Sequence, residues 1–290
     1  MRGVYVVKLK WIALFLAAFL FTGCLGGTGG SPTATVGLYM ADTHGLMPLS
    51  AEADVSQIDE IWVTINRIEA KRDGHWEVIA KLSGGAKVNL FDLQAQAQLL
   101  VEKSIPAGRY SEFRLVLNED AGANYVVLRD GTEAVLKVPS GKLQVKNVDI
   151  VVQADTVVEL IFDINAAQFV ARGENGFIVN PAQVLKILDG DLLGSLDFRL
   201  ELPRFILEEL DGVLGDLTVG FSVRRNGVAR PFAELVFENG ILEFSLERLL
   251  PGTYEVSAFV RYKDQFHWEL EAEKIIVEPG SNLWSKEIPG

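Results

Sequence analysis

Sulfur and imidazole side chains are scarce in this sequence, which has one cysteine and three histidines among 290 residues. A single thiol, Cys24, allows neither an internal disulfide nor a cysteine zinc cage, so folding depends on burial of apolar side chains. The sequence contains no Gly-x-Ser-x-Gly nucleophile elbow, no His-Glu-x-x-His zinc motif and no Gly-x-x-x-x-Gly-Lys phosphate loop. We therefore expect no enzyme activity and no bound cofactor, and we interpret His44, His75 and His267 as solvated surface side chains.

Basic residues are also fewer than acidic ones. Lysine and arginine total 27 against 39 aspartate and glutamate residues, which gives a formal net charge of −12. Nucleic acids and anionic lipid surfaces attract proteins through clustered basic side chains. The composition therefore argues against a nucleic-acid partner and against electrostatic adhesion to a membrane, and we expect the acidic residues to form a solvated surface.

Long hydrophobic runs are missing except near the amino end. There, Arg2, Lys8 and Lys10 precede an apolar run at residues 11–21, which is too short to span a bilayer comfortably. A short basic segment followed by such a run is typical of a secretory signal peptide. We expect residues 1–23 to be removed, and loss of the three basic residues would change the formal charge from −12 to −15.

The apolar run ends at Phe21-Thr22-Gly23-Cys24. Small residues directly before a cysteine at this place resemble the bacterial lipobox, which implies cleavage after Gly23 and lipidation of Cys24. Two acyl chains, which contribute about 0.8 kcal/mol per buried methylene, would hold the mature protein on a membrane. An ordinary secretory signal, or an N-terminal membrane anchor with an incidental cysteine, is the alternative interpretation.

The rest of the chain divides into a tether and two predicted domains. Residues 24–34 are rich in glycine, which predicts a flexible tether, and about ten such residues span on the order of 17 Å as a random coil. Small and acidic residues at 188–194 interrupt two strand-like stretches and indicate a domain boundary. We therefore predict an N-terminal domain at residues 35–189 and a C-terminal domain at residues 190–290.

Alternation of apolar and polar residues predicts strands in both domains. Apolar Ile61, Val63 and Ile65, for example, alternate with polar or amphipathic neighbours. Asp-Gly and Asn-Gly dipeptides, which accept positive φ and favour tight hairpin turns, occur at residues 73–74, 130–131, 175–176, 226–227 and 239–240. The predicted fold class is mainly β, with two antiparallel β-sandwich domains of the immunoglobulin-like or transthyretin-like kind after the lipoprotein signal peptide.

Three local patterns refine this prediction. The apolar phase shifts by one residue after Ile65, which predicts a β-bulge near Asn66-Arg67. Residues 90–103 and 205–214 are the two segments that favour short helices, although neither has convincing caps. A proline-glycine turn precedes a strand-opening tyrosine at both Tyr110 and Tyr254, which indicates either a shared sandwich plan or convergence on good turn chemistry.

Aromatic side chains provide the first candidate binding residues. Trp62 is out of phase with its apolar neighbours on the strand, and Trp76 lies beside a predicted turn. An exposed tryptophan on a flat sheet can stack on a sugar ring. Packing in a buried layer is the alternative interpretation, since tryptophan is usually largely buried.

Neighbouring carboxylates provide the second candidates. Asp59-Glu60, Glu119-Asp120 and Asp189-Gly190-Asp191 could each offer oxygen ligands to calcium. The last of these is the best candidate because two carboxylates flank a glycine at the predicted domain junction. None has the spacing of a complete calcium-binding loop, so we assign no metal site from the sequence.

Several blocks of the N-terminal domain together resemble a known family. The blocks lie at residues 58–69, 74–76, 88–93, 105–117 and 136–141. They follow one another in the order of domain-of-unknown-function family 4382, which the chain resembles from about residue 35 to residue 188. That family occurs in exported bacterial and archaeal proteins, often lipoproteins, which implies an exported location and leaves the activity open. Residues 249–256 show a weaker similarity to the transthyretin-like and carboxypeptidase-regulatory modules, which are accessory β-sandwiches.

From these observations we expect an exported, lipid-anchored protein of the cell envelope or surface. Its predicted role is non-catalytic: a scaffold, an adhesive surface or a partner-binding protein, held to the membrane through its N-terminal lipid. Its partner would be another envelope protein or a glycan. The alternative is a lipoprotein that binds carbohydrate or calcium.

Overall fold

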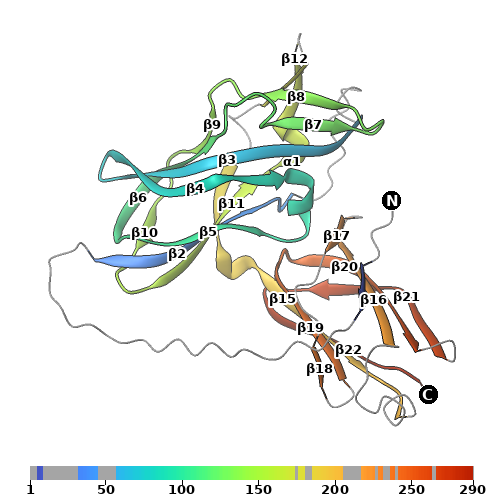
Figure 1. Ribbon diagram of the computed structural model, residues 1–290. Coiled ribbons are helices and arrows are strands. Elements are labelled where there is room, and N and C mark those ends of the chain that lie inside the picture. The colour runs from blue at the N-terminus through green and yellow to red at the C-terminus, as the bar shows by residue number, and fades with distance from the viewer. Residues whose placement is uncertain are drawn as a thin grey trace.

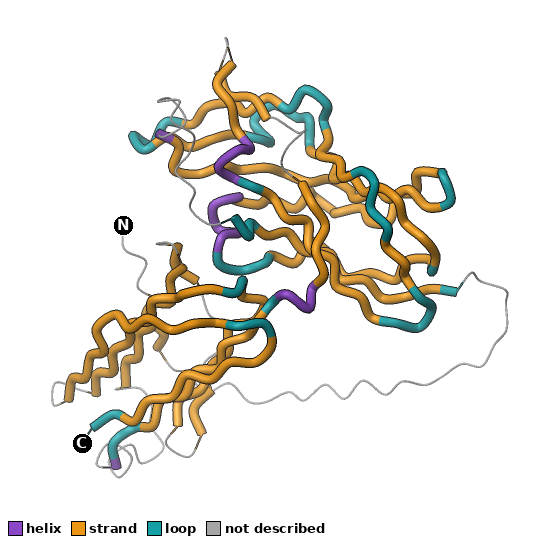
Figure 2. Tube along the Cα trace, turned by 180° about the vertical axis from the view of Figure 1, so that it is seen from behind, coloured by secondary structure: helices purple, strands orange, loops and turns teal. Residues whose placement is uncertain are grey.

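The computed structural model describes ten segments of the chain, and strands fill most of them. Only short helical turns interrupt the strands: η2 (Leu90–Gln94), α1 (Ala166–Phe169) and η4 (Gly190–Leu192) (Figure 2). Among the described residues, no helix has the length and hydrophobicity needed to cross a membrane. The mainly β prediction is therefore confirmed. The described segments are residues 5–8, 32–44, 57–173, 176–179, 185–204, 217–225, 228–230, 236–238, 241–262 and 266–289.

Two sheets enclose the first core, which is built from residues 34–179. In the larger sheet the strand order is β10-β6-β3-β7-β8-β13-β12, with β4 paired to β3 and β9 paired to β6. The smaller sheet has the order β14-β11-β2-β5. The strands are β2 (Thr33–Ala41), β3 (Ile58–Arg72), β4 (His75–Asn89), β5 (Gln98–Pro106), β6 (Gly108–Leu117), β7 (Tyr125–Leu128), β8 (Glu133–Lys137), β9 (Lys142–Val145), β10 (Ile150–Val152), β11 (Val157–Ile164), β12 (Val170–Gly173), β13 (Gly176–Val179) and β14 (Leu185–Asp189).

Alternating apolar residues explain why these two sheets share one core. On β3, Ile61, Val63 and Ile65 are fully buried, and on β11 Phe162 and Ile164 are fully buried as well. Burial of such side chains contributes about 1.5–3 kcal/mol each relative to exposure. The larger sheet thus supplies one wall of the core and β11 with β2 supplies the opposite wall.

The second core lies between two further sheets, separate from the first group of strands in Figure 1. It is rich in aromatic side chains: Phe198 stacks on Phe244 with ring centroids 4.4 Å apart, and Phe221 and Trp284 pack against Phe198. Ala95 also belongs to this core although it comes from the N-terminal half of the chain. The strands are β1 (Tyr5–Lys8), β15 (Gly194–Glu201), β16 (Leu217–Arg225), β17 (Val228–Arg230), β18 (Val236–Glu238), β19 (Ile241–Leu249), β20 (Gly252–Tyr262), β21 (Phe266–Val277) and β22 (Gly280–Glu287).

The sheets are mixed, which corrects the prediction of purely antiparallel domains. β2 runs parallel to β11, β8 parallel to β13, and β15 parallel to β22. A hairpin leaves a turn signal between its two strands, whereas a parallel pair joins segments that are distant in the sequence and leaves no local signal. The sequence pattern therefore indicated the hairpins and missed the parallel pairs.

Several local predictions are confirmed. The register of β3 shifts between Ile65 and Arg67 in its pairing with both β4 and β6, as expected for the predicted bulge. Positive φ values of 50° at Asp73 and 82° at Gly74 form the turn between β3 and β4. The Asp-Gly dipeptide at residues 130–131 likewise joins β7 to β8. The predicted turns at 226–227 and 239–240 and the predicted helix at 205–214 lie outside the described residues.

The predicted helix at residues 90–103 is wrong beyond its first turn. A 3-10 turn covers Leu90–Gln94, and the chain then enters strand β5 at Gln98. The segment between them is held by the second core rather than by helical hydrogen bonds: the hydroxyl group of Tyr254 donates to the carbonyl oxygen of Ala95 at 2.6 Å. Tertiary contacts have thus overridden the helical propensity of this glutamine- and alanine-rich segment.

The two tyrosines that follow proline-glycine turns play the same structural role in both cores. The hydroxyl groups of Tyr110 and Tyr254 each donate to a carbonyl oxygen four residues earlier, at 2.7 Å in both cases. Both tyrosines are fully buried. Gly108 and Gly252, two residues before them, have φ values of 150° and 145°, a conformation that L side chains rarely adopt. The similarity noted in the sequence therefore corresponds to one repeated local structure.

The two groups of strands meet at the segment between η2 and β5. Arg225 on β16 donates hydrogen bonds to the carbonyl oxygens of Gln94 and Pro251. The backbone N–H of Ala97 donates to the carbonyl oxygen of Arg248 at 2.9 Å, and that of Leu250 donates to Ala95 at 3.0 Å. A small apolar cluster containing Tyr39, Ile161, Leu193 and Leu250 covers the same junction.

Candidate functional site

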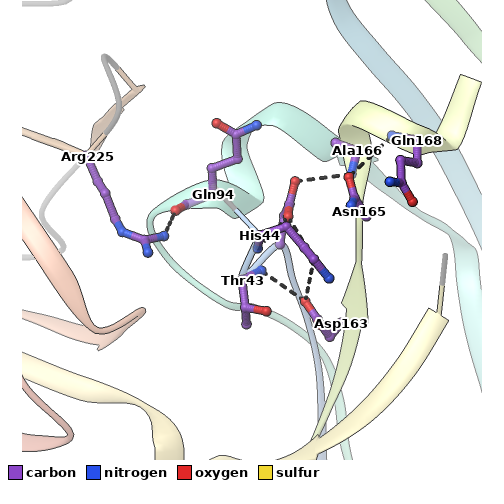
Figure 3. A network of polar contacts seen from close by, with 9 residues as sticks. Thr43, His44, Gln94, Asp163, Asn165, Ala166, Gln168 and Arg225 are labelled. Atoms are coloured by element: carbon purple, nitrogen blue, oxygen red, sulfur yellow. Dashed lines mark hydrogen bonds and ion pairs between the residues drawn. The ribbon is translucent and has the colours of Figure 1, made fainter. Parts of the chain in front are cut away.

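Two aspartates and a histidine come together where β2 ends beside β11. Asp42 and His44 follow β2 directly, and Asp163 lies on β11. Because β2 and β11 are parallel and Asp163 is the register partner of Ala41, the residues that follow β2 pass next to the Asp163 carboxylate. One ligand atom from each of Asp42, His44 and Asp163 lies within 4.8 Å of the others (Figure 3). We refer to these three residues as the Asp-His-Asp cluster.

Backbone N–H groups fix both carboxylates. Asp42 accepts hydrogen bonds from the N–H groups of His44 at 3.0 Å and Ala166 at 3.1 Å. Asp163 accepts one from the N–H group of Thr43 at 2.9 Å. Asn165 caps the N-terminus of α1 by accepting from Gln168, which places the Ala166 N–H group beside Asp42. Aspartates that bind the backbone two residues later commonly stabilise turns of this kind.

The electrostatics of the cluster are unusual because its negative charge is buried and poorly compensated. Asp42 and Asp163 are only 1% and 2% exposed, whereas the side chain of His44 is 29% exposed. Neither carboxylate forms an ion pair with a lysine or arginine in the part of the chain that the structure describes. Burial raises the pKa of Asp42, and the nearby charge of Asp163 adds to this increase, while hydrogen bonds from Ala166 and His44 oppose it. A proton or a cation would relieve this excess charge.

The cluster lies next to the junction between the two cores. The N–H group of Asp42 donates to the carbonyl oxygen of Leu93 at 3.0 Å. The carbonyl oxygen of the next residue, Gln94, accepts from Arg225 (Figure 3). The Gln94 side chain is 2% exposed, and its Oε1 atom accepts no hydrogen bond from the described residues. One short backbone segment therefore connects the cluster to the second group of strands.

The sequence interpretation missed this cluster because its members are far apart in the chain. His44 was expected to be an isolated surface histidine. Its side chain is partly exposed, but its Nδ1 atom lies 3.5 Å from Asp42 and 3.7 Å from Asp163. One feature of the sequence could have indicated this site. Asp163 is a charged residue within the apolar run of β11, and an aspartate is rarely buried without a partner.

The predicted lipid-attachment residue Cys24 and the predicted cleavage residue Gly23 lie outside the described residues. Strand β1 comes from the segment predicted to be the signal peptide, and it pairs antiparallel with β16 in the full chain.

The predicted binding tryptophan Trp62 faces away from the core, as its phase indicated, and is half-buried by polar and aromatic neighbours. Its Nε1 atom donates to Glu60 at 2.5 Å. Its ring stacks on Tyr125 with centroids 6.3 Å apart, and the Lys87 ammonium group lies 4.7 Å from its centroid. These contacts occupy much of the indole surface that a sugar would need.

Trp76 is half-buried and also has a neighbour on its ring, the guanidinium group of Arg114 at 3.9 Å from the centroid. Arg114 in turn forms an ion pair with Glu69. Trp76 on β4 pairs with Lys71 on β3, and Lys71 comes nine residues after Trp62 along β3. At about 3.3 Å per strand residue, the two tryptophans are separated by about 30 Å. The structure does not bring the two predicted aromatic residues into one site.

The three predicted carboxylate groups stay apart from the Asp-His-Asp cluster. Glu60 accepts from Trp62, and Asp189 caps η4 by accepting from the N–H group of Asp191 at 3.1 Å. None of these acidic residues belongs to the group of metal-ligating side chains found among the described residues.

A groove of about 710 Å³ lies between β9 and β14. Lys142, Lys146 and Lys186 line it together with aliphatic side chains. The lining includes neither Trp62 nor Trp76, so the groove is not the aromatic sugar site that the sequence suggested.

Comparison with known proteins places the first core in a family. The model of a family described as a domain of unknown function, DUF4382, matches residues 33–181. No curated protein matches the chain. The predicted resemblance of residues 35–188 is therefore confirmed, and the similarity of the C-terminal part to transthyretin-like modules stays a prediction.

Two solved structures show distant similarity. One is a leucine-rich repeat protein from Bacteroides thetaiotaomicron VPI-5482, 12% identical over 89% of this chain and 26% of its own, with a TM-score of 0.22. The other is a proposed adhesin from Bacteroides ovatus, 10% identical over 83% of this chain and 77% of its own, with a TM-score of 0.23. The chain spans about a quarter of the leucine-rich repeat protein. Both TM-scores are too low to carry an argument about fold or function.

Proposed function

Because the chain belongs to the DUF4382 family, whose function is unknown, we propose a function from the features of the chain itself. It is an exported, lipid-anchored protein of the cell envelope that acts by binding or scaffolding rather than by catalysis. The observation that carries this proposal is the cysteine at the end of a short apolar run. The thiol of Cys24 is the single attachment point for lipid that the sequence offers.

The position of the first core strand supports the proposal. β2 begins at Thr33, nine residues after Cys24. β2 is an interior strand, bonded to β11 on one side and β5 on the other. A force applied through the lipid would therefore reach a strand that is held along both edges, and a tether with a root-mean-square span of about 17 Å would keep the first core close to the membrane surface.

Two features support the finer description of the fold. Each core is bounded by two sheets whose apolar faces meet, as in a β-sandwich. Each also contains a buried tyrosine that bonds back to the turn before its strand. We include two β-sandwich domains, divided near residue 189, in the proposal.

The role of partner binding follows from the surface rather than from a catalytic centre. The outer face of β3 and its neighbours carries a ladder of charged side chains in which Arg67 and Arg114 flank Glu69 and Lys71 pairs with Glu112. Such a rigid, polar face can present side chains to another envelope protein. A carbohydrate partner has less support, because the rings of both candidate tryptophans are already in contact with other side chains.

The lipid anchor is tested by expressing the full chain in a bacterial host fed with labelled palmitate. Because the chain has one cysteine, thiol-linked label can arise only at Cys24. We expect the wild type to carry label, to lack residues 1–23 by mass spectrometry and to fractionate with membranes. Cys24→Ser should lose the label and the cleavage, whereas the control Gly23→Ala keeps a small residue before the cysteine and should retain both. A free thiol at Cys24, or an intact leader peptide, would refute the anchor.

A further inference from the structure

We propose that the Asp-His-Asp cluster binds a divalent transition-metal ion of the zinc type through Asp42 Oδ1, His44 Nδ1 and Asp163 Oδ1. The ion would add a ligand-binding property to the proposed envelope protein, and the site does not depend on the lipid anchor. Its evidence is the spacing of the three donor atoms, their burial and the groups that hold them.

The spacing fits a shared ion better than hydrogen bonds within the cluster. His44 Nδ1 lies 3.5 Å from Asp42 Oδ1 and 3.7 Å from Asp163 Oδ1. Hydrogen bonds between a histidine nitrogen and a carboxylate oxygen are shorter, about 2.7–2.9 Å when charged. Ligands placed tetrahedrally around zinc at about 2.1 Å are separated by about 3.4 Å. The ligand oxygens of Asp42 and Asp163 lie within 4.8 Å of each other, so all three donors are close enough to share one ion.

The charge of the cluster also calls for a cation. Two carboxylates that are 97% or more buried face each other, and His44 is the single basic side chain within ion-pair distance in the described structure. A neutral imidazole is the form that binds a metal. Two ionised aspartates and one divalent ion would leave the cluster without net charge, so the cost of burying the carboxylates would be largely removed.

Supporting hydrogen bonds hold the ligands in place before any ion arrives. Three backbone N–H groups bond the carboxylates, those of Thr43, His44 and Ala166. Such supporting bonds are common around metal ligands and fix their orientation. Asp163 Oδ1 accepts one hydrogen bond from the described residues, that of the Thr43 N–H group. A carboxylate oxygen has two lone pairs, so Oδ1 can still coordinate a cation.

The kind of ion follows from the donors. Calcium and magnesium prefer ligand shells made entirely of oxygen, with six or more donors. A histidine nitrogen with two carboxylates instead suits zinc and its neighbours among the transition metals. Three protein ligands leave a fourth position, and the partial exposure of His44 places that position towards solvent. A water molecule or a donor group of a partner protein could complete the shell.

The test measures zinc binding by isothermal titration calorimetry with the full chain purified in detergent and stripped with a chelator. We expect the wild type to bind one equivalent of Zn²⁺ and to gain thermal stability, with Ca²⁺ and Mg²⁺ binding far more weakly. His44→Ala removes one ligand from a partly exposed position, so folding should be preserved. Its affinity for zinc should fall about 100-fold or more. Removing a hydrogen bond that supports a metal ligand already lowers affinity by up to about 100-fold, and removing a ligand should lower it at least as much.

His75→Ala is the matched control, because His75 is exposed at the start of β4 and has no carboxylate partner among the described residues. This variant should bind zinc like the wild type. The proposal is overturned if the wild type shows no saturable zinc binding, or if His44→Ala and His75→Ala bind zinc equally well. Tighter binding of calcium than of zinc would also overturn it. None of these results bears on the lipid anchor, which the labelling experiment tests separately.

Discussion

Replacing Asp163 by asparagine should make the metal-free protein more stable, although it alters a buried polar residue. The ligand atoms of Asp42 and Asp163 lie within 4.8 Å of each other. At an effective dielectric constant of about 20, two full negative charges at that distance repel each other by about 3.5 kcal/mol. Asparagine removes one charge, and its Oδ1 atom can still accept from the Thr43 N–H group. Because Asp42 can avoid part of the repulsion by taking up a proton, we expect a gain of about 1–3 kcal/mol at neutral pH.

The same electrostatics predict how the stability of the folded protein changes with pH. Burial and the charge of Asp163 raise the pKa of Asp42 in the folded state above the ordinary aspartate value of 3.8. The folded protein therefore holds this proton more tightly than the unfolded chain does. The resulting stability is fully present below pH 3.8 and is lost as the pH rises through the higher folded pKa. Asp163→Asn should reduce this loss.

Urea denaturation of the chelator-treated protein at several pH values measures both effects. Asp59→Asn is the control, because Asp59 is exposed and makes no ion pair in the described structure. It should leave the free energy of unfolding within about 0.5 kcal/mol of the wild type. Added zinc should stabilise the wild type and the control, but not Asp163→Asn. Destabilisation of the metal-free Asp163→Asn protein at neutral pH would refute the electrostatic reasoning.

Two further predictions concern the junction and the tryptophans. The hydroxyl group of Tyr254 shares its one hydrogen between the carbonyl oxygens of Ala95 and Leu250, so Tyr254→Phe removes the donor of two acceptors and should cost about 1–3 kcal/mol of unfolding free energy. Tyr110→Phe removes the donor of one acceptor and should cost less, about 1 kcal/mol. Equal losses in urea denaturation would contradict a role of the tyrosine at the junction. Glycan titrations should leave tryptophan fluorescence unchanged in the wild type, Trp62→Ala and Trp76→Ala, and a saturable change in the wild type alone would restore the carbohydrate alternative.

The features that could be predicted from the sequence are those encoded by residues close together in the chain. The turn at Asp73-Gly74 requires positive φ, and the dipeptide supplies residues that accept it. The bulge after Ile65 appears as a change of phase within one strand. The two tyrosines each bond to a carbonyl group four residues earlier. In each case the physical cause and the sequence signal occupy the same few residues.

The pairing of β2 with β11 could not be predicted in this way, because more than a hundred residues separate the two strands. The same pairing brings Asp163 to Asp42, so the candidate site could not be predicted either. The helix expected after Leu90 failed for a related reason: Ala95 is buried in the second core and Ala97 in the small apolar cluster at the junction, where small side chains allow close approach of the backbones. Their helical propensity was real, but contacts with distant residues determined the conformation.

A buried charge is nevertheless a signal that sequence reading could use. Asp163 shares its face of β11 with Ile161, which is fully buried, and is itself only 2% exposed, so its side chain cannot easily reach water. An unpaired carboxylate in such a place costs several kcal/mol, and a stable protein does not retain it without a compensating group or a use. Asp59, by contrast, is exposed at the start of β3, beside the register shift between Ile58 and Glu60, and needs no partner. A carboxylate in the middle of a buried strand therefore indicates a candidate site better than the number of neighbouring carboxylates does.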